Sequence, residues 1–406
     1  MQLFRWLEII VHLPSFIIGG FLLSNNCYCS DVEMMSTFRQ HVYAVVMGGG
    51  FGKKLWPVSK RKRPKQFIDL FNDGTMILKT LQRIAGLVPE ENILVITSAL
   101  GKQLLLELSP HFQESNIIVE PACRNTAPCI ALASAHIKKR DPEALTIILP
   151  ADHLVRDSDA FELIMQAALL QAQHSMGLVT LGIMPTRPET AYGYIQATES
   201  LPMPEGFGVD DRFKLFAVKA FAEKPDYATA LNFLETRDFY WNSGIFVWHI
   251  KAIWQEFQRS MPDLYHDFLT IYNHLGTQSE QKIIEDVYSW IHPCSIDRGI
   301  MEKAERVFVL TGEFGWTDLG CWDEVLHVAG DLPVLVAEQE GGHHMEIACE
   351  NLFVKTMPDK VIATIGVKDV MIIETDKALL VCHKGQSHRV REIVDMLRRA
   401  GLEDYL

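Results

Sequence analysis

The chain has 406 residues, which is enough for two or three domains. Its content of 48% hydrophobic and 22% charged residues is typical of a globular protein. A formal net charge of −13 argues against a general nucleic-acid-binding protein, because the binding domain of such a protein is normally basic. No CxxC pair is present, so we expect neither a zinc site nor a disulfide framework.

The first 36 residues differ from the rest of the chain. Residues 9–30 carry no formal charge, as in a signal peptide or a membrane anchor. Against this, Arg5 is offset by Glu8, and a histidine and a proline interrupt the apolar run. Met34 and Met35 precede the first convincing strand, so the alternative is a misassigned start. We expect a cytoplasmic protein, with membrane contact or export only if the leader is retained.

From Val42 onward, short β-branched runs alternate with helical patterns. Strands are expected at 42–47, 93–98, 116–120 and 145–150, and helices at 75–87, 103–109 and 128–140. Thr75 is expected to be the N-cap of the first of these helices. This alternation predicts an α/β fold with a Rossmann-like, doubly wound, mainly parallel sheet. Ligands of such sheets bind beyond the carboxyl ends of the strands, where the glycines after Met47, the segment 120–126 and Asp152 all fall.

After about Leu332 the pattern changes to short strands joined by turns, followed by a final helix at 391–402. This pattern predicts a small all-β module, with a few coils of a β-helix. The expected organisation is a leader at 1–36, a main α/β domain at 37–331 and a β-helix-like C-terminal domain with a terminal helix at 332–406.

A glycine loop follows the first expected strand and leads into seven basic residues within thirteen positions, 53–65. Three interpretations are open: a nucleotide phosphate site, a nucleic-acid or nuclear-import patch, or a solvated charged turn. The GxGxxG fingerprint fails because Lys53 stands at its sixth position, and a P-loop fails because Lys54 replaces the required Ser or Thr. Glycines nevertheless let a backbone approach a polyphosphate, and lysines supply charge for it.

The segment GGFGKKLWP, Gly49–Pro57, followed by RPKQF, resembles the signature of sugar-phosphate nucleotidylyltransferases, and most closely that of mannose-1-phosphate guanylyltransferases. Further matching blocks follow in order: EPACRNTAPCIALA, PADH, RPETAYGYIQ, FAEKP, WNSGIFVW, SIDRGIMEKA and WTDLGCWDEV. The resemblance runs from Val42 to the C-terminus. It implies a Rossmann-like catalytic domain and a short left-handed β-helix domain. Larger relatives carry an additional cupin-type isomerase module, so a single-function form is expected here.

The resemblance implies that GTP and mannose 1-phosphate give GDP-mannose and pyrophosphate. Such a reaction requires that the enzyme position the phosphate groups of the two substrates and neutralise their negative charge. The implied metal ligands are Asp152 and Asp318, for Mg²⁺ or Mn²⁺, although Asp152 could instead cap a helix and Asp318 end a turn. The implied phosphate contacts are Gly49, Gly50, Gly52, Lys53, Lys54, Lys65 and, for the sugar phosphate, Lys224.

The base is expected to contact residues of the block EPACRNTAP: Glu120, Arg124, Asn125 and Thr126. The hexose is expected to contact Glu189, Gly193, Glu223 and Asn242. Three alternatives stay open. Glu120 could simply cap its strand, Arg124 could form a plain salt bridge, and Gly193 could mark a β-bulge. Arg61, Lys62 and Arg63 are expected to serve only as outer steering charge.

The glycine loop departs from the family pattern at three positions. Phe51 replaces a small residue, Lys53 a hydroxyl residue and Lys54 an arginine. Lysine keeps the charge but loses the bidentate fork, which would cost about tenfold to a few hundredfold in rate. Phe51 is expected either to pack under the loop or to narrow the nucleotide site. Two alternatives remain: a guanylyltransferase for another sugar 1-phosphate, and a non-catalytic regulatory paralogue that binds sugar nucleotides. The oligomeric state stays open, with a homodimer as the form that relatives of this length often adopt, and no nucleic-acid partner is expected.

Overall fold

The computed structural model describes residues 38–207, 210–330 and 343–406, and residues 40–406 form one compact unit. The expected leader at 1–36 and the expected domain boundary at 331/332 lie outside the described residues. Within the described ranges, no helix is long and apolar enough to cross a membrane.

A nine-stranded sheet forms the centre of the α/β part, in the order β3-β2-β1-β4-β9-β6-β10-β8-β7. Strands β9 and β8 run against the other seven, so the mainly parallel sheet is confirmed. Its strands are β1 (Val42–Gly48), β2 (Ile93–Thr97), β3 (Ile117–Val119), β4 (Leu145–Pro150), β6 (Leu178–Ile183), β7 (Gly193–Leu201), β8 (Lys214–Glu223), β9 (Phe239–His249) and β10 (Val307–Thr311). A separate antiparallel pair consists of β5 (His153–Val155) and β11 (Trp316–Asp318).

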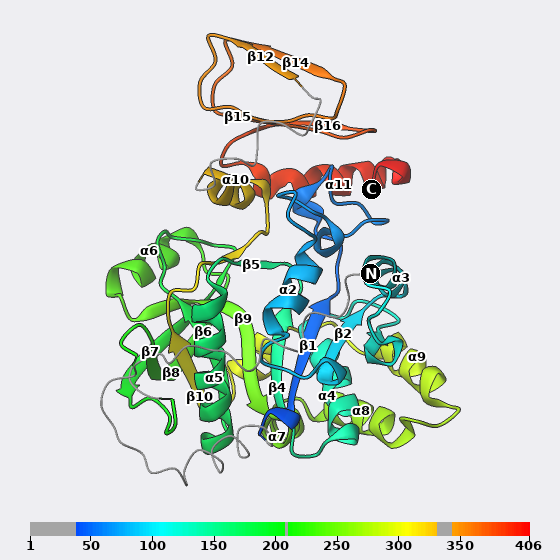
Figure 1. Cartoon of the computed structure of the whole chain (residues 1–406), viewed down its shortest axis with the longest axis vertical. Helices are drawn as coiled ribbons and strands as arrows, with labels where there is room; N and C mark the ends of the chain where they lie inside the picture. The colour runs from blue at the N-terminus through cyan, green and yellow to red at the C-terminus, as the bar shows by residue number, and fades with distance from the viewer. Residues whose placement is uncertain (1–37, 208–209, 331–342) are drawn as a thin grey trace, which may run out of the picture. The chain divides into compact units, whose positions relative to one another are not determined.

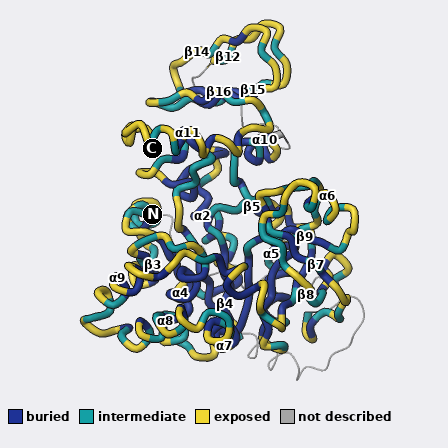
Figure 2. Tube along the Cα trace, turned by 180° about the vertical axis from the view of Figure 1, so that it is seen from behind, coloured by how far each residue is buried: buried dark blue, intermediate teal, exposed yellow. Residues whose placement is uncertain are grey.

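The central strands are buried on both faces, as their continuous apolar sequences require (Figure 2). Helices α4, α7, α8 and α9 share one large core cluster with Tyr43 and Val45 of β1. Helices α2 and α5 also contact the sheet, but none of their residues belongs to this cluster. The helices are α2 (Met76–Ile84), α3 (Ala99–Leu108), α4 (Thr126–Arg140), α5 (Ser158–Ser175), α6 (Tyr227–Thr236), α7 (Ile250–Ser260), α8 (Pro262–His274), α9 (Glu280–Trp290), α10 (Trp322–Gly330) and α11 (Val390–Arg399).

Strand register brings the predicted loops to one end of the sheet. Met47 pairs with both Ile96 and Pro150, and Thr97 pairs with Val119, so β1, β2, β3 and β4 end side by side. The glycine loop, Glu120 and Asp152 therefore leave the sheet at the same edge. One local expectation fails in detail. Thr75 precedes α2 as expected, but its hydroxyl makes no capping hydrogen bond.

The C-terminal domain is built from coils of constant length. His343 pairs with Val361, Glu350 with Lys368 and Phe353 with Met371, all in parallel and each 18 positions apart. Its strands are β12 (His343–Ile347), β13 (Phe353–Lys355), β14 (Val361–Ile365), β15 (Val370–Glu374) and β16 (Leu379–His383). Repeated parallel pairing at one offset is the pattern of a β-helix-like domain, so this prediction is confirmed.

The segment after the glycine loop packs against this C-terminal domain. Leu55 and Trp56 share a core cluster with Met371, Val394 and Leu406. The indole of Trp56 donates a hydrogen bond of 2.7 Å to a carbonyl near the C-terminus, that of Tyr405. In Figure 1 the blue loop after β1 lies against α11, and the residue contacts agree.

Part of the basic segment is used in the same packing. Lys53 pairs with Asp395 at 3.2 Å, Lys60 with Asp376 at 3.0 Å, and Arg61 with Glu403 at 2.6 Å; these three carboxylates all belong to the C-terminal domain. The role of Arg61 as outer steering charge stays a prediction, and the structure adds a contact that the sequence did not indicate. Its partner is a carboxylate of its own chain.

We predict that replacing Val394 by Ala lowers the free energy of unfolding by about 2 kcal/mol, because a fully buried side chain leaves a cavity in the shared cluster. Met396 lies on the same helix and is 60% exposed, so Met396→Ala should change stability by less than about 0.5 kcal/mol. Urea unfolding of both variants measures this difference. Equal losses would contradict the packing role of α11.

Candidate functional site

Two adjoining pockets lie at the carboxyl end of the sheet. The first, the phosphate-side pocket, has a volume of about 280 Å³ and is lined by Gly52, Lys53, Lys54, Lys65, Asp152, Asp318, Gly320 and Arg391. The second, the sugar-side pocket, has about 320 Å³ and is lined mainly by β7, β8, β9 and the segment around Asp297. Asp318 lines both pockets, so a ligand that occupies both would pass this carboxylate.

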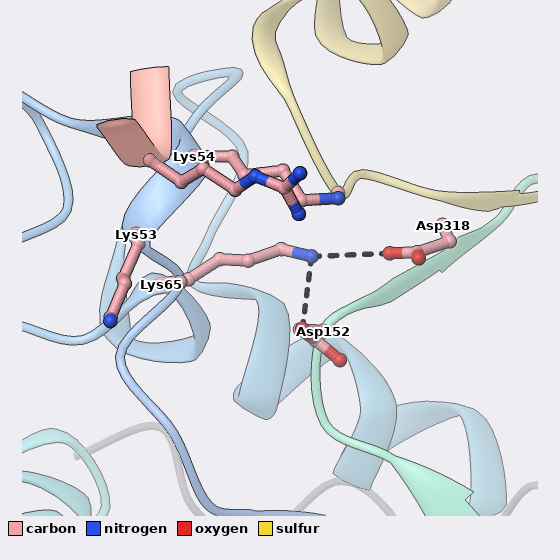
Figure 3. Close-up of a pocket in the computed structure, with 8 residues that line it drawn as sticks. Lys53, Lys54, Lys65, Asp152 and Asp318 are labelled. Atoms are coloured by element: carbon pink, nitrogen blue, oxygen red, sulfur yellow. Dashed lines mark hydrogen bonds and ion pairs between the residues drawn. The ribbon is translucent and has the colours of Figure 1, made fainter. Parts of the chain in front are cut away.

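A buried ammonium group joins the two predicted metal ligands. Lys65 Nζ lies 2.9 Å from Asp152 Oδ2 and 3.3 Å from Asp318 Oδ1 (Figure 3). The side chain of Lys65 is only 4% exposed. Burial alone would lower the pKa of Lys65, but the two carboxylates raise it above its ordinary value. Burial alone would raise the pKa of Asp152, yet Lys65 and the neighbouring His153 hold it below its ordinary value. Lys65 and Asp152 are therefore both charged at neutral pH.

The local fold explains how these groups meet. Lys65 begins the short 3₁₀ helix Lys65–Phe67, Asp152 follows β4, and Asp318 ends β11 opposite His153. Gly52 makes the approach possible. Its backbone is left-handed with φ of 71°, and a Cβ at this position would stand 2.5 Å from the Cβ of Lys65. The third glycine of the loop is thus required by both conformation and space.

The three departures from the family pattern have three different environments. Phe51 packs against the core cluster shared with the C-terminal domain and lines neither pocket, so of the two expectations the structure shows packing. Lys53 pairs with Asp395 and points away from the two carboxylates (Figure 3). Lys54 lines the phosphate-side pocket and has no ion pair among the described residues.

The sugar-side pocket contains three of the four residues expected to contact the hexose. Gly193, Glu223 and Asn242 line it, together with Lys224. Gly193 pairs with Glu223 in regular antiparallel register, and the register shift occurs only beyond Gln196, so Gly193 does not mark a bulge. The ammonium of Lys224 lies 3.1 Å from Glu223 Oε1. The fourth residue, Glu189, lines neither pocket, and its carboxylate accepts a hydrogen bond from the backbone of its own turn.

Of the four residues expected to contact the base, Glu120 and Thr126 lie near the glycine loop or a pocket, whereas Arg124 and Asn125 line neither pocket. Glu120 is 8% exposed and lies beneath the glycine loop, with Oε2 3.7 Å from where a Cβ of Gly49 would stand. Tyr288 donates a hydrogen bond of 2.9 Å to Glu120. Burial raises the pKa of Glu120 to about 7. Thr126 lines the sugar-side pocket, and its hydroxyl accepts a hydrogen bond from the backbone N–H of Ile296.

Two other residues of that block are engaged elsewhere. The guanidinium of Arg124 donates hydrogen bonds of 3.1 and 2.9 Å to the carbonyl of Tyr288, near the end of α9. The side chain of Asn125 accepts a hydrogen bond from the N–H of Thr126 at the start of α4. Neither residue lines a pocket, so their contact with a nucleotide stays a prediction.

Three pocket residues were not assigned a role from the sequence. Asp297 accepts a hydrogen bond of 2.7 Å from Asn242, and burial together with the charge of Glu223 raises its pKa to about 6. His153 accepts a hydrogen bond from Trp316, and burial lowers its pKa. Both stand in recognisable blocks, SIDRGI and PADH. The third, Arg391, lies in the terminal helix, where no motif marks it.

Comparison with protein families gives two matches along the chain. A family model described as nucleotidyl transferase matches residues 43–333. A second, described as a MannoseP isomerase/GMP-like beta-helix domain, matches residues 342–397. The two families therefore follow one another as the two folded parts do.

Individual relatives agree with these matches. A mannose-1-phosphate guanylyltransferase 2 of Escherichia coli O157:H7 is 32% identical over 90% of this chain and 75% of its own. The xanthan biosynthesis protein XanB of Xanthomonas campestris is 32% identical over 89% of this chain and 74% of its own. A crystal structure from Thermus thermophilus, titled mannose-1-phosphate geranyltransferase, has a TM-score of 0.75 at 33% identity, covering 88% of this chain and 99% of its own. The chain belongs to the nucleotidyl transferase family and, within it, to the mannose-1-phosphate guanylyltransferases.

Proposed function

We propose that the chain transfers the GMP moiety of GTP to mannose 1-phosphate, giving GDP-mannose and pyrophosphate. One observation carries this proposal: Lys65 is held between Asp152 and Asp318 in a cationic pocket, and Asp318 also lines the adjoining pocket, which is suited to a sugar phosphate. Relatives at 31–32% identity are named for the same activity. Polyphosphate on one side and hexose on the other is the arrangement that the reaction needs.

In this reaction a phosphate oxygen of mannose 1-phosphate attacks the α-phosphorus of GTP. The bond from the α-phosphorus to the bridging oxygen breaks, and pyrophosphate leaves with the electron pair. No proton transfer to carbon and no covalent enzyme intermediate is required. The residues of this chain act by positioning the two phosphates and by neutralising their charge. Lys54 and Lys65 would bind the nucleotide phosphates, and Lys224 the sugar phosphate.

The two carboxylates fit a divalent cation. Among the described residues, no three His, Cys, Asp or Glu side chains gather as a closed metal site. Asp152 and Asp318 nevertheless both contact the ammonium group of Lys65, so their carboxylates lie close to one point. Mg²⁺ is commonly held by one or two carboxylates, with substrate phosphates completing its ligands. These two residues would hold Mg²⁺ or Mn²⁺, which supplies charge neutralisation at the reacting phosphates when bound.

The hexose and the base would lie on either side of this centre. Asn242 and Glu223, within the sugar-side pocket, offer an amide and a carboxylate to sugar hydroxyls. Glu120 lies beneath Gly49 and lines neither pocket, and its carboxyl group would accept hydrogen bonds from the N–H donors of guanine. Adenine has no N1–H donor at neutral pH, so an ionised Glu120 would favour GTP over ATP.

The direct test is pyrophosphate release from GTP, Mg²⁺ and mannose 1-phosphate. We expect release that requires both substrates and is much slower with ATP or glucose 1-phosphate. Equal rates with glucose 1-phosphate would indicate a different sugar specificity. Binding of GDP-mannose without any release would instead indicate a regulatory paralogue and contradict the proposal.

We predict opposite effects of Lys65→Met on activity and on metal affinity. Loss of the ammonium should lower kcat by about 100-fold or more, because a charge that stabilises the reacting phosphates is gone. The same change frees two carboxylates, so the protein without nucleotide should bind Mn²⁺ more tightly. Electron paramagnetic resonance measures free Mn²⁺. The exposed Lys62→Met in the same segment is the matched control and should change neither quantity. Weaker Mn²⁺ binding by Lys65→Met would contradict the arrangement.

We predict that Glu120 makes the protein less stable as pH rises. Its folded pKa of about 7 lies above its ordinary value of 4.5, so the stability that Glu120 contributes is fully present below pH 4.5 and is lost as pH rises through 7. Relative to wild type, Glu120→Gln should therefore gain about 2 kcal/mol between pH 5 and pH 8. Urea unfolding at both pH values measures this gain. The exposed Glu107→Gln serves as control, and a flat difference for Glu120→Gln would refute the raised pKa.

A further inference from the structure

The C-terminal helix α11 places a guanidinium group, that of Arg391, at the phosphate-side pocket. Arg391, the second residue of α11, is exposed and lines this pocket together with Lys54 and Lys65. In the part of the chain that the structure describes, Arg391 makes no hydrogen bond or ion pair. Its neighbours differ: Arg389 pairs with Glu392, and Arg398 lies 3.5 Å from Asp395.

The position of Arg391 is fixed by the packing of its helix. Val390 and Val394 are buried in the core cluster shared with the glycine-loop segment. Asp395 pairs with Lys53, which begins the short helix after the glycine loop. Arg391 precedes Asp395 by four positions, so the two side chains share one face of α11. The contacts that attach α11 to the glycine loop therefore also hold Arg391 at the pocket.

The charges of the pocket indicate a polyanionic ligand. Its lining residues include four cations, Lys53, Lys54, Lys65 and Arg391, and two carboxylates, Asp152 and Asp318. Lys53 is paired with Asp395 outside this set, and Lys65 is paired with both carboxylates. Among the residues that the structure describes, Lys54 and Arg391 remain as two cations without an ion pair, in a cavity of about 280 Å³ and in a protein whose net charge is −13. A small polyphosphate matches this size and charge.

We propose that Arg391 binds the β- and γ-phosphates of the nucleotide and the pyrophosphate that leaves, so that the C-terminal domain completes the active site. The proposal rests on the proposed function, since it assigns one end of the same substrate. A guanidinium can donate two parallel hydrogen bonds to a phosphate, which the ammonium of Lys54 cannot. Arg391 thus supplies the bidentate donor that the two lysines of the glycine loop lack.

The test compares Arg391→Met with Arg399→Met, an exposed position on the same helix that lines neither pocket. For Arg391→Met we expect the KM for GTP and the Kd for inorganic pyrophosphate to rise about tenfold to a hundredfold. The KM for mannose 1-phosphate and the Kd for GDP-mannose, which lacks the leaving pyrophosphate, should change less than about twofold. Arg391→Lys should recover part of the loss, and circular dichroism should show unchanged folding.

The outcomes separate this inference from the proposed function. If wild type binds GTP and pyrophosphate without turnover, the proposed function fails, yet weaker pyrophosphate binding by Arg391→Met still supports the phosphate role. If Arg391→Met matches Arg399→Met in every affinity, the inference is overturned even where turnover is normal. An equal loss for GTP, pyrophosphate and GDP-mannose also overturns it, because a merely structural role would affect all ligands alike.

Discussion

The ion pair cluster of Lys65 with Asp152 and Asp318 is the interaction on which the rest of the site depends. A nearly buried ammonium is costly unless carboxylates compensate it, and the two carboxylates would repel one another without it. Three separate segments must therefore meet at one point: the 3₁₀ helix after the glycine loop, the end of β4 and the end of β11. Gly52 has no side chain because the Cβ of Lys65 takes that space. The geometry of the phosphate-side pocket follows from this cluster.

A second constraint is the packing of the glycine-loop segment against the C-terminal domain. Apolar residues on both sides form one core cluster, and Lys53, Lys60 and Arg61 pair with acidic residues of that domain. This explains why an acidic protein concentrates positive charge after its glycine loop. Lys53, Lys60 and Arg61 form ion pairs with the C-terminal domain. Lys54 and Lys65 line the pocket in which a ligand would bind. The segment that lines the phosphate-side pocket thus also contacts the C-terminal domain.

Much of this could be predicted from the sequence because local patterns carry it. The alternation of apolar strands and helices predicted the sheet, and strand ends predicted that the glycine loop, Glu120 and Asp152 would share an edge. The motif blocks led to Lys65, Asp318, Gly193 and Asn242, which all line the pockets. The metal, the homodimer and the contacts to substrate stay predictions.

What the sequence could not reveal depends on contacts between distant residues. Nothing local marks Arg61 as the partner of Glu403, 342 positions away, or Arg391 as a neighbour of Lys54. Arg124 stands in a motif beside Asn125, yet its hydrogen bonds go to the end of α9. Such roles are set by tertiary packing, which a single sequence does not display.

The constant 18-residue offset of the C-terminal strands restricts how this domain can vary in length. Each parallel pair stacks a residue on the one a full coil later, so Phe353 lies beside Met371 in the buried interior. Inserting one residue within a strand would exchange its inward and outward side chains, because side chains alternate along a strand. Inserting a whole coil would keep the stacking and add a layer. Length in this domain can therefore change in steps of about one coil, while α11, which carries Arg391, must stay against the glycine loop.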